Sequence, residues 1–388
     1  MLSRDLANDL EILLSRKSIK RLSGIPMKCY KYAMTAIFIN TISGRQLTKG
    51  QEANYNWVYN IKSRPQDFKK QEVYNYLKQT VETSLEAAGY KNPKNYETIN
   101  KLFDFFRNIV EQTKRNGTFL TPVGIIEDFL DVKEIYKNTN YVNIKSHHWI
   151  NIDLATGMIV TVPEFFTYSD IVNNWNIFVD KYLEYKSIVT SDSDAPLIEI
   201  RNKRENRRLN YEIDTLMRTL IISSVTFVES YLYYIFFNIK NSNFELKTET
   251  AQNFIKYHKV EDDEIIKRLL LKEFITKPST ELKRISVKYK EINSVRNRLI
   301  HASAFESVTK TSELLPLLTI STVQLIDTLD TCKRLVEIID NALPDDLKIL
   351  VWWDSVTHPN FKKYGKGDIT NPDSLLSKIK YMEDYSFE

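Results

Sequence analysis

The chain has 388 residues, enough for two or three domains with a sizeable core. Apolar residues make up 43% of the chain, but there are only 9 glycines and 11 prolines, so tight turns are scarce. This composition favours long helices joined by polar loops over a β-sandwich, which needs a turn signal about every 8–12 residues. A net charge of +4 is too small to indicate a polyanionic partner, so the distribution of charge matters more.

Several function classes lack their sequence signals. The chain has no Gly-rich phosphate loop, no Ser-His-Asp context and no cysteine cluster, so NTPase, serine-hydrolase and redox activities have no support, and we expect no cofactor. Cys29 and Cys332 lie far apart and share no motif, which predicts reduced thiols in a cytosolic protein. Residues 1–22 are charged and lack the apolar core of a secretory signal. We therefore expect a cytoplasmic location.

Residues 1–145 are predicted to form a helical N-terminal domain. Apolar residues at helical spacing indicate helices over 64–90 and 95–117. A further helix is predicted over 121–138, with Thr121 as its N-cap and Pro122 as its first helical residue.

Residues 146–198 depart from this pattern. The sequence HHWINIDLATGMIVTV alternates apolar and polar residues around an Ala-Thr-Gly turn, which predicts a β-hairpin over 147–162. A helix over 169–188 and a polar linker over 189–197 follow. His147 and His148 could ligate a metal, but no third ligand lies at a suitable spacing, so we predict no metal site.

Residues 199–342 are predicted to form a bundle of four or five helices. The expected helices span 209–240, about 261–275 and 279–301. A last helix is expected to begin at the N-cap Ser312, with Pro316 in its first turn. The stretch 220–239 is long enough to cross a bilayer, but Glu229 lies in its middle, so we expect a buried core helix and no membrane partner. The tail, 343–388, mixes aromatic and turn residues and is expected to pack on a domain. The fold class is therefore mainly α, with a small β-hairpin insert.

The helix predicted over 279–301 carries a cation on its apolar face. Arg296 follows Ile292 by four residues and so lies near the middle of that face. A buried ion without a partner is costly. Glu229 is the only acidic residue in 220–239, so we expect an ion pair between Glu229 and Arg296. The face consists of Leu282, Ile285, Tyr289, Ile292, Val295 and Leu299.

The polar residues that follow Arg296 point elsewhere. Asn297 and His301 are four residues apart and share a face roughly opposite the apolar one, with Arg298 to one side. A regular helix therefore directs Arg296 inward and His301 outward. The two side chains converge only if the helix ends within this stretch, or if a second copy of the chain supplies the complementary residues.

The sequence RNRLIH at 296–301 resembles the Arg-x4–6-His signature of the HEPN superfamily, and VESYLYYIF at 228–236 resembles its acidic-aromatic segment. The resemblance covers 205–342, about a third of the chain. It implies a metal-independent endoribonuclease that acts as a homodimer, with two motifs forming one composite cleft. In this family Arg296 would bind the scissile phosphate, Asn297 would hold the geometry and His301 would act as general acid or base. Glu229 would support the site.

The resemblance also implies a biological setting and an RNA partner. Many such enzymes serve prokaryotic antiviral defence, abortive infection or toxin–antitoxin systems, in which an antitoxin or a guide RNA can exert control. Basic residues near the motif and at 201–208 are candidates for phosphate contacts, because neutralised phosphates provide non-specific affinity. These candidates are Arg298, Lys290, Lys288, Lys283, Arg284, Arg207 and Arg208.

Plainer interpretations remain open. The motif can be a charged helix end with an incidental histidine, and 201–208 can be a solvated basic helix start. The domain can also be a catalytically silent HEPN module that binds nucleotides or a protein or RNA partner, or a purely structural scaffold. His358 is expected to have no special role, and the pair Trp352-Trp353 is expected to pack rather than stack on bases.

Overall fold

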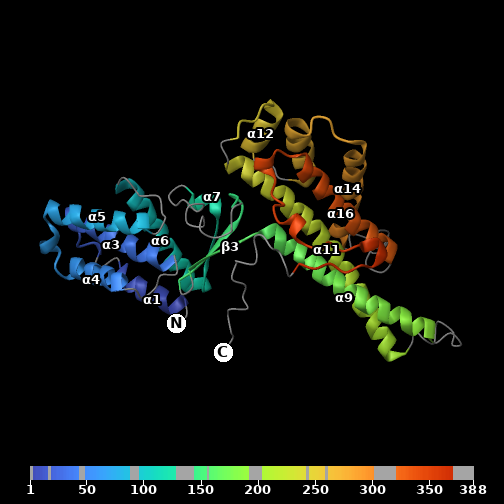
Figure 1. Ribbon diagram of the computed structural model, residues 1–388, viewed down its shortest axis with the longest axis horizontal. Coiled ribbons are helices and arrows are strands. Elements are labelled where there is room, and N and C mark those ends of the chain that lie inside the picture. Colours follow the sequence, from blue (N-terminus) through green and yellow to red (C-terminus); the bar gives the residue numbers. More distant parts are fainter. Residues whose placement is uncertain are drawn as a thin grey trace, which may run out of the picture. The chain divides into compact units, whose positions relative to one another are not determined.

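The computed structural model describes residues 3–15, 19–42, 49–87, 96–127, 144–154, 157–191, 203–241, 244–257, 261–300 and 320–369. Within these residues the protein is mainly helical, as predicted, with one small antiparallel sheet (Figure 1). The chain divides into two compact units: the first contains the described residues before Val162, and the second those from Val162 onward. This division places the hairpin in the first unit and the helix after it in the second, whereas we predicted one segment, 146–198, for both.

The first unit is built around one apolar helix. The helix α3 (Gly24–Ile42) contacts α4 (Lys49–Ser63), α5 (Gln71–Ala87) and α6 (Tyr96–Asn116), and α1 (Ser3–Leu13) packs on α6. The α6 bounds agree with the helix predicted over 95–117. The helix predicted over 64–90 is instead divided into a short 3-10 helix, η1 (Pro65–Phe68), and α5.

The hairpin predicted over 147–162 is confirmed, and a third strand joins it. Strands β1 (Phe119–Pro122), β2 (Trp149–Asp153) and β3 (Gly157–Thr161) form an antiparallel sheet in the order β1-β2-β3. The predicted helix start at Thr121 was wrong, because Thr121 pairs with Ile150 in β1 and the short helix α7 (Val123–Ile126) begins only after Pro122. A β-branched threonine and a proline at the end of an edge strand suit this geometry. Residues 128–138 of that prediction lie outside the described residues.

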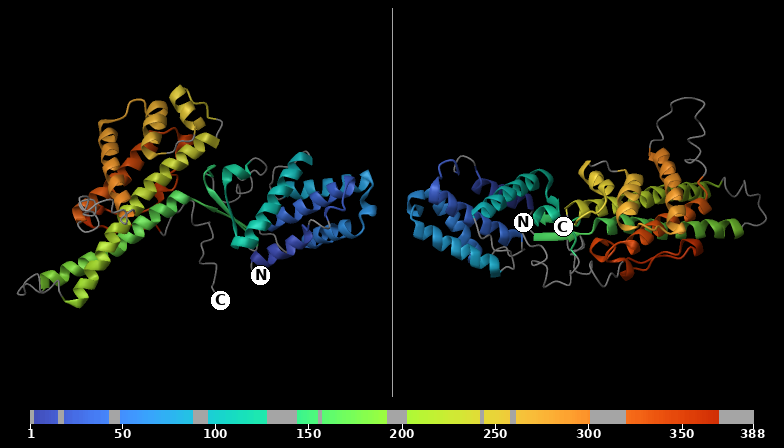
Figure 2. Two further views of the ribbon diagram at one scale, coloured as in Figure 1. Left: turned by 180° about the vertical axis from the view of Figure 1, so that it is seen from behind. Right: turned by 90° about the horizontal axis from the view of Figure 1, so that it is seen from above.

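The second unit is a helical bundle with α11 (Arg204–Asn241) at its centre. This helix contacts α9 (Pro163–Ser191), α14 (Thr280–Ile300) and α16 (Thr322–Ala342), and Figure 2 shows α9 and α11 side by side in both views. The bundle therefore includes α9, which we predicted as part of the preceding segment. The structure also describes the helices α12 (Glu249–Tyr257) and α13 (Asp262–Glu264) and the π-helix η2 (Ile265–Phe274) in this unit.

Several helix ends differ from their predicted positions, and α9 and α11 begin at Pro163 and Arg204 instead of 169 and 209. The helix α9 continues to Ser191, into the predicted linker over 189–197. The helix α16 begins at Thr322, where the Ser321 hydroxyl accepts a hydrogen bond from the backbone N–H of Gln324. The predicted cap Ser312 and Pro316 lie outside the described residues.

Among the described helices, α11 is long and apolar enough to cross a membrane, but 56% of its most apolar window is buried inside the protein. The helices α9, α14 and α16 all contact it. This burial is what a core helix of a bundle requires, because its apolar side chains are removed from water by their neighbours.

Residues 343–369, the described part of the predicted tail, pack on the second unit. Short 3-10 helices, η4 (Asp345–Leu347), η5 (Trp353–Ser355) and η6 (Phe361–Lys363), shape this segment. Trp352 is fully buried, as expected for a packing residue, and its ring meets that of Phe165 edge to face at 5.0 Å. The Trp175 indole N–H donates a hydrogen bond to the Gly365 carbonyl at 3.0 Å. The segment is thus bound to α9 by aromatic packing and by hydrogen bonds.

Candidate functional site

The predicted ion pair between Arg296 and Glu229 is present in the second unit. Residues of α14 three and four positions apart are buried and direct its apolar face into the bundle, where it contacts α11 and α16. Arg296 lies on this face with 13% of its side chain exposed, and its Nη2 pairs with Oε1 of Glu229 on α11. Glu229 is 35% exposed, so the carboxylate lies at the edge of the core rather than in its centre.

The charge and the hydrogen bonds of Arg296 both depend on its burial. Burial lowers the pKa of Arg296, but an arginine stays charged in proteins because its ordinary pKa is so high. Its Nε is buried and has no hydrogen-bond partner among the described residues, and the same is true of the Asn293 side-chain oxygen one turn earlier on α14. A guanidinium has five N–H donors, and the carboxylate contact engages one terminal nitrogen. A guanidinium is also well suited to bind a phosphate.

Two other polar residues of the predicted motif do not lie on the buried face. Asn297 and Arg298 are exposed, as the helical spacing predicts. His301 directly follows Ile300, the last residue of α14, and lies outside the described residues. The described structure therefore unites Arg296 with Glu229 and separates both from the side chains of Asn297 and Arg298.

The cations predicted to bind RNA along α14 are partly neutralised within the unit. Lys288 pairs with Asp327 of α16, and Lys290 pairs with Asp263 of α13 at 3.3 Å between Nζ and Oδ2. Lys283 and Arg284 are exposed and form no ion pair with the residues that the structure describes. A polyanion would therefore meet less free charge on α14 than the sequence suggests.

The two basic residues predicted on α11 lie far from Glu229. Arg207 and Arg208 precede Glu229 by more than 20 positions, which corresponds to about 30 Å along a helix that rises about 1.5 Å per residue. Arg208 also pairs with Glu212 at 3.0 Å. In a single chain these arginines do not belong to the same site as Arg296.

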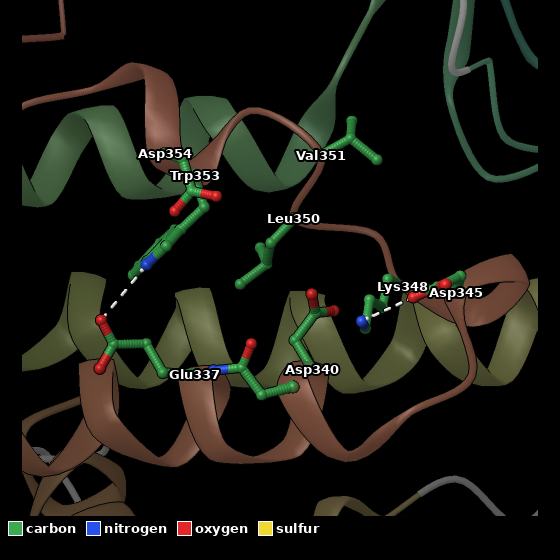
Figure 3. Close-up of a pocket in the computed structure, with 9 residues that line it drawn as sticks. Glu337, Asp340, Asp345, Lys348, Leu350, Val351, Trp353 and Asp354 are labelled. Carbon is green, nitrogen blue, oxygen red and sulfur yellow. Dashed lines mark hydrogen bonds and ion pairs between the residues drawn. The ribbon is translucent and has the colours of Figure 1, made fainter.

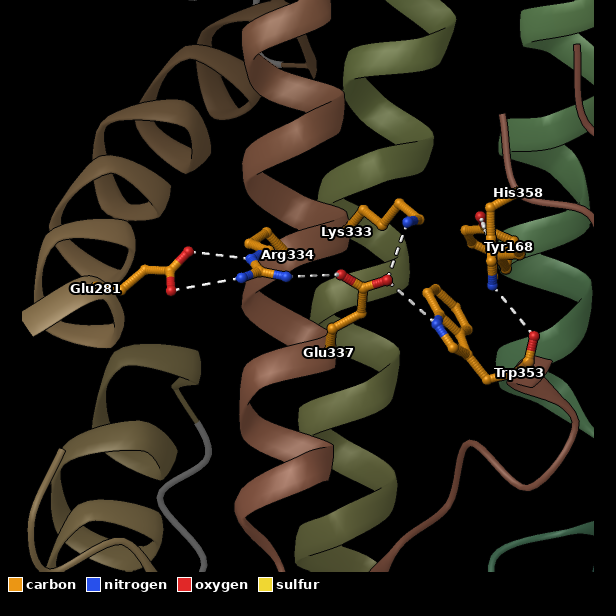
Figure 4. Close-up of polar contacts among 7 residues, drawn as sticks. All are labelled: Tyr168, Glu281, Lys333, Arg334, Glu337, Trp353 and His358. Carbon is orange, nitrogen blue, oxygen red and sulfur yellow. Dashed lines mark hydrogen bonds and ion pairs between the residues drawn. The ribbon is translucent and has the colours of Figure 1, made fainter. Parts of the chain in front are cut away.

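A second polar arrangement, which the sequence does not reveal, links three elements of the bundle (Figure 4). The Tyr168 hydroxyl of α9 donates to Nδ1 of His358 at 2.6 Å, and the His358 Nε2–H donates to the Trp353 carbonyl at 3.1 Å. The Trp353 indole N–H donates to Glu337 of α16 at 3.2 Å. Arg334 lies between Glu337 and Glu281, at 3.8 Å from the first and 3.0 Å from the second. The chain of contacts joins α9, α16 and α14.

His358 is the neutral base of this arrangement, although its sequence context predicts no role. Burial lowers its pKa to about 4, and the nearby Lys333 charge acts in the same direction. In the neutral ring, Nδ1 accepts the hydrogen bond from the Tyr168 hydroxyl, and the Nε2–H donates to the Trp353 carbonyl. The arrangement is structural, because Tyr168, Glu337, Trp353 and His358 attach the 343–369 segment to the bundle and Arg334 joins α16 to α14.

An acidic pocket of about 260 Å³ lies beside this network, at the C-terminal end of α16 (Figure 3). Asp340 is buried at its base and accepts hydrogen bonds from the Tyr231 hydroxyl and the Ile349 backbone N–H, both at 3.1 Å. Burial nevertheless raises the pKa of Asp340. Lys348 pairs with Asp345 at the rim, at 2.7 Å. The carboxylates of Asp340 and Asp345 are therefore satisfied by groups of the protein itself.

The pocket and the Arg296 pair are separate places. The contact between Glu281 and Arg334 and the pair of Lys288 with Asp327 show that α14 and α16 run antiparallel. Arg296 lies 15 residues beyond Glu281 on α14, which is about 22 Å at about 1.5 Å per residue, and so lies toward the opposite end of α16 from the pocket.

The histidines of the hairpin and the cysteines are buried. Burial lowers the pKa of His148 well below its ordinary value, and its Nδ1 accepts a hydrogen bond from the Lys145 backbone N–H at 3.1 Å. Cys29 and Cys332 are free thiols, as predicted, and burial raises the pKa of Cys29 to about 11. Neither thiol is disposed to react at neutral pH.

Comparison with known proteins adds no relative to these observations. No family model matches the chain, and no curated protein and no solved structure matches it either. Any assignment of function therefore depends on the residues and on their geometry.

Proposed function

We propose that this chain is a metal-independent endoribonuclease of the HEPN type, which acts as a homodimer in the cytoplasm. The observation that carries the proposal is the partly buried Arg296, which Glu229 holds at the arginine position of the RNRLIH motif. An arginine on an apolar helix face is costly unless the fold uses it. A guanidinium can bind a phosphate through two parallel hydrogen bonds.

The chemistry requires only proton transfer and charge stabilisation, because RNA carries its own nucleophile. The ribose 2′-hydroxyl attacks the adjacent phosphorus, the bond from phosphorus to the 5′-oxygen breaks, and a 2′,3′-cyclic phosphate and a 5′-hydroxyl result. His301 removes the 2′-hydroxyl proton or donates one to the departing oxygen, and the His301 of a second copy takes the complementary step. Arg296 stabilises the negative charge that develops on the phosphate, and Asn297 maintains the geometry.

The biological role that fits this activity is prokaryotic antiviral defence or a toxin function. An enzyme that cleaves cellular RNA needs control, which a neighbouring antitoxin or a guide RNA would provide. The motif resemblance alone supports this role.

A second candidate function is a catalytically silent module that binds nucleotides or a protein or RNA partner. The observation that favours it is the pairing of Arg296, Lys288 and Lys290 with carboxylates of the same unit. Cations held in this way stabilise the bundle and leave less charge for a substrate. RNA binding that weakens with salt and proceeds without cleavage would identify this function.

The deciding experiment is cleavage of total cellular RNA in EDTA by the wild type, Arg296→Ala, His301→Ala and the control Arg268→Ala. Arg268 is an exposed arginine of η2 that pairs with Glu264. We expect cleavage by the wild type and the control, and a loss of about 100-fold or more in both motif variants. Circular dichroism of each variant verifies that the fold is retained. Equal cleavage by all four proteins would contradict the proposal, and binding without cleavage by the wild type would support the second candidate.

A further inference from the structure

The first unit contains two half-buried lysines that face aromatic rings. Lys28 and Lys31 lie one turn apart on α3. The Lys28 ammonium is 5.5 Å from the centre of the Tyr74 ring and 5.4 Å from that of Tyr96. The Lys31 ammonium is 5.9 Å from the Tyr96 ring and 5.3 Å from the Phe103 ring. Tyr96 is therefore shared by both cations.

Lys28 and Lys31 have no carboxylate partner among the described residues. Within the described part of the chain, neither ammonium forms an ion pair, and Lys31 donates one hydrogen bond, to the Asn100 side-chain oxygen at 2.7 Å. Ring faces attract a cation, but weakly in comparison with a carboxylate. Two like charges one helical turn apart also repel each other. The cluster of Lys28, Lys31, Tyr96 and Asn100 thus carries two positive charges that no described carboxylate neutralises.

A ligand with two negative charges would complete this cluster. Each ammonium has three N–H donors, so most of the donors remain available. Burial raises the pKa of Tyr96, which keeps its phenol neutral beside an incoming anion. A phosphate monoester carries about −1.5 to −2 charges at pH 7, whereas a carboxylate or a phosphodiester carries one and would leave one lysine unmatched. The aromatic walls reduce the access of water and strengthen each charge contact.

We propose that Lys28, Lys31, Tyr96 and Asn100 form a binding site for a phosphate monoester group. The site belongs to the first unit and does not depend on RNA cleavage by the second. Inorganic phosphate, a mononucleotide and a 5′-phosphorylated RNA end share the required chemistry. A site of this kind would give the first unit a ligand to sense.

The test is isothermal titration calorimetry of the full chain at low salt. The probes are inorganic phosphate, AMP, adenosine, and a short 2′-O-methyl RNA with either a 5′-phosphate or a 5′-hydroxyl. We expect inorganic phosphate, AMP and the 5′-phosphorylated RNA to bind, and adenosine and the 5′-hydroxyl oligonucleotide not to occupy this site. The tightest of the three binders identifies the source of the phosphate.

Variants locate the binding site. We expect Lys28→Gln and Lys31→Gln each to weaken the binding of AMP by about tenfold or more, because a charge-assisted hydrogen bond is lost. The matched control is Lys101→Gln, which removes one positive charge from an exposed residue of α6 that pairs with Glu97. Asn100→Asp is nearly isosteric, and we expect it to abolish binding by placing a carboxylate beside Lys31, even if a lysine variant fails to fold. Failure of inorganic phosphate, AMP and the 5′-phosphorylated RNA all to bind, or equal binding by wild type and variants, would overturn the proposal.

Discussion

Two pairs of half-buried cations, one in each unit of the molecule, have different partners. In the second unit, pairs such as Arg296 with Glu229 and Lys288 with Asp327 join one helix to the next. In the first unit, Lys28 and Lys31 face tyrosine and phenylalanine rings and one amide oxygen. Arg296 and Lys288 join helices of the second unit, whereas Lys28 and Lys31 pair with no described carboxylate of the first.

The largest expected effect comes from breaking the pair in the second unit. Glu229→Ala leaves the Arg296 charge partly buried without its partner, and we expect a loss of about 2–4 kcal/mol in the free energy of unfolding. The value is below that of a fully buried pair because Glu229 is 35% exposed. Urea unfolding of the wild type and the variant measures this difference in the free energy of unfolding.

The double variant Glu229→Leu/Arg296→Met separates the pair from the packing around it. Replacing both charges by apolar side chains should restore most of the lost stability, because no unpaired ion remains. A change below about 0.5 kcal/mol in Glu229→Ala would mean that the pair carries little of the bundle's stability.

The next largest effect is expected on stability in acid, where His358 of the second unit becomes protonated. Burial lowers the pKa of His358 from 6.5 to about 4 in the folded state. Between these values the unfolded chain binds the proton and the folded chain does not, so stability falls as the pH is lowered from 6.5 toward 4 and is unaffected by this group above 6.5. We expect about 1–2 kcal/mol, reduced from the full value because His358 is partly exposed.

His358→Gln should remove this contribution. Carboxylates titrate in the same range, so the informative quantity is the difference in unfolding free energy between the wild type and His358→Gln at pH 7 and pH 4.5. Two parallel pH profiles would show that the histidine is not held neutral.

A smaller effect is expected at the exposed pair. Lys288 and Asp327 are 31% and 51% exposed, so Asp327→Asn should cost no more than about 1 kcal/mol, and less in high salt. The same change releases the Lys288 charge. If the second unit binds RNA, its affinity should rise, which fluorescence anisotropy of a labelled RNA can measure. A loss of affinity would exclude Lys288 from the contact surface.

The smallest effect is expected in the first unit. Without a ligand, Lys28→Gln should leave the free energy of unfolding within about 0.5 kcal/mol of the wild type or raise it slightly, because a repulsion is relieved. Urea unfolding in a phosphate-free buffer provides the measurement. A loss of more than about 1 kcal/mol would mean that the ring contacts of Lys28 are structural, and the contrast between the two units would weaken.

The parts of the candidate site that the sequence predicts are those set by local periodicity. Arg296 follows the spacing of its apolar neighbours on α14, and Glu229 is the only acid in a long apolar run, so helical spacing and charge together are enough to pair the two. Asn297 and Arg298 are exposed for the same reason. The repeat of a regular helix fixes which side chains face the core, and this repeat is visible in the order of the residues.

The remainder depends on contacts between distant segments. His358 contacts Tyr168 across 190 residues, and Asp340 contacts Tyr231 across 109. No local sequence pattern predicts either contact. The helix α3 is apolar on most sides, which hides the face that Lys28 and Lys31 share. Thr121 fits a helix cap as well as a strand, and only its pairing with Ile150 decides between them. Local preference could not settle these points because tertiary contacts override it.

The measurement that tests the central claim most directly is cleavage in EDTA of one RNA sequence in two forms, one with native riboses and one with a 2′-O-methyl group on every ribose. The proposed mechanism uses the 2′-hydroxyl as nucleophile, so we predict cleavage of the native RNA to a 2′,3′-cyclic phosphate and no cleavage of the methylated form. Cleavage of both forms, or cleavage of the native RNA that stops in EDTA, would contradict the account.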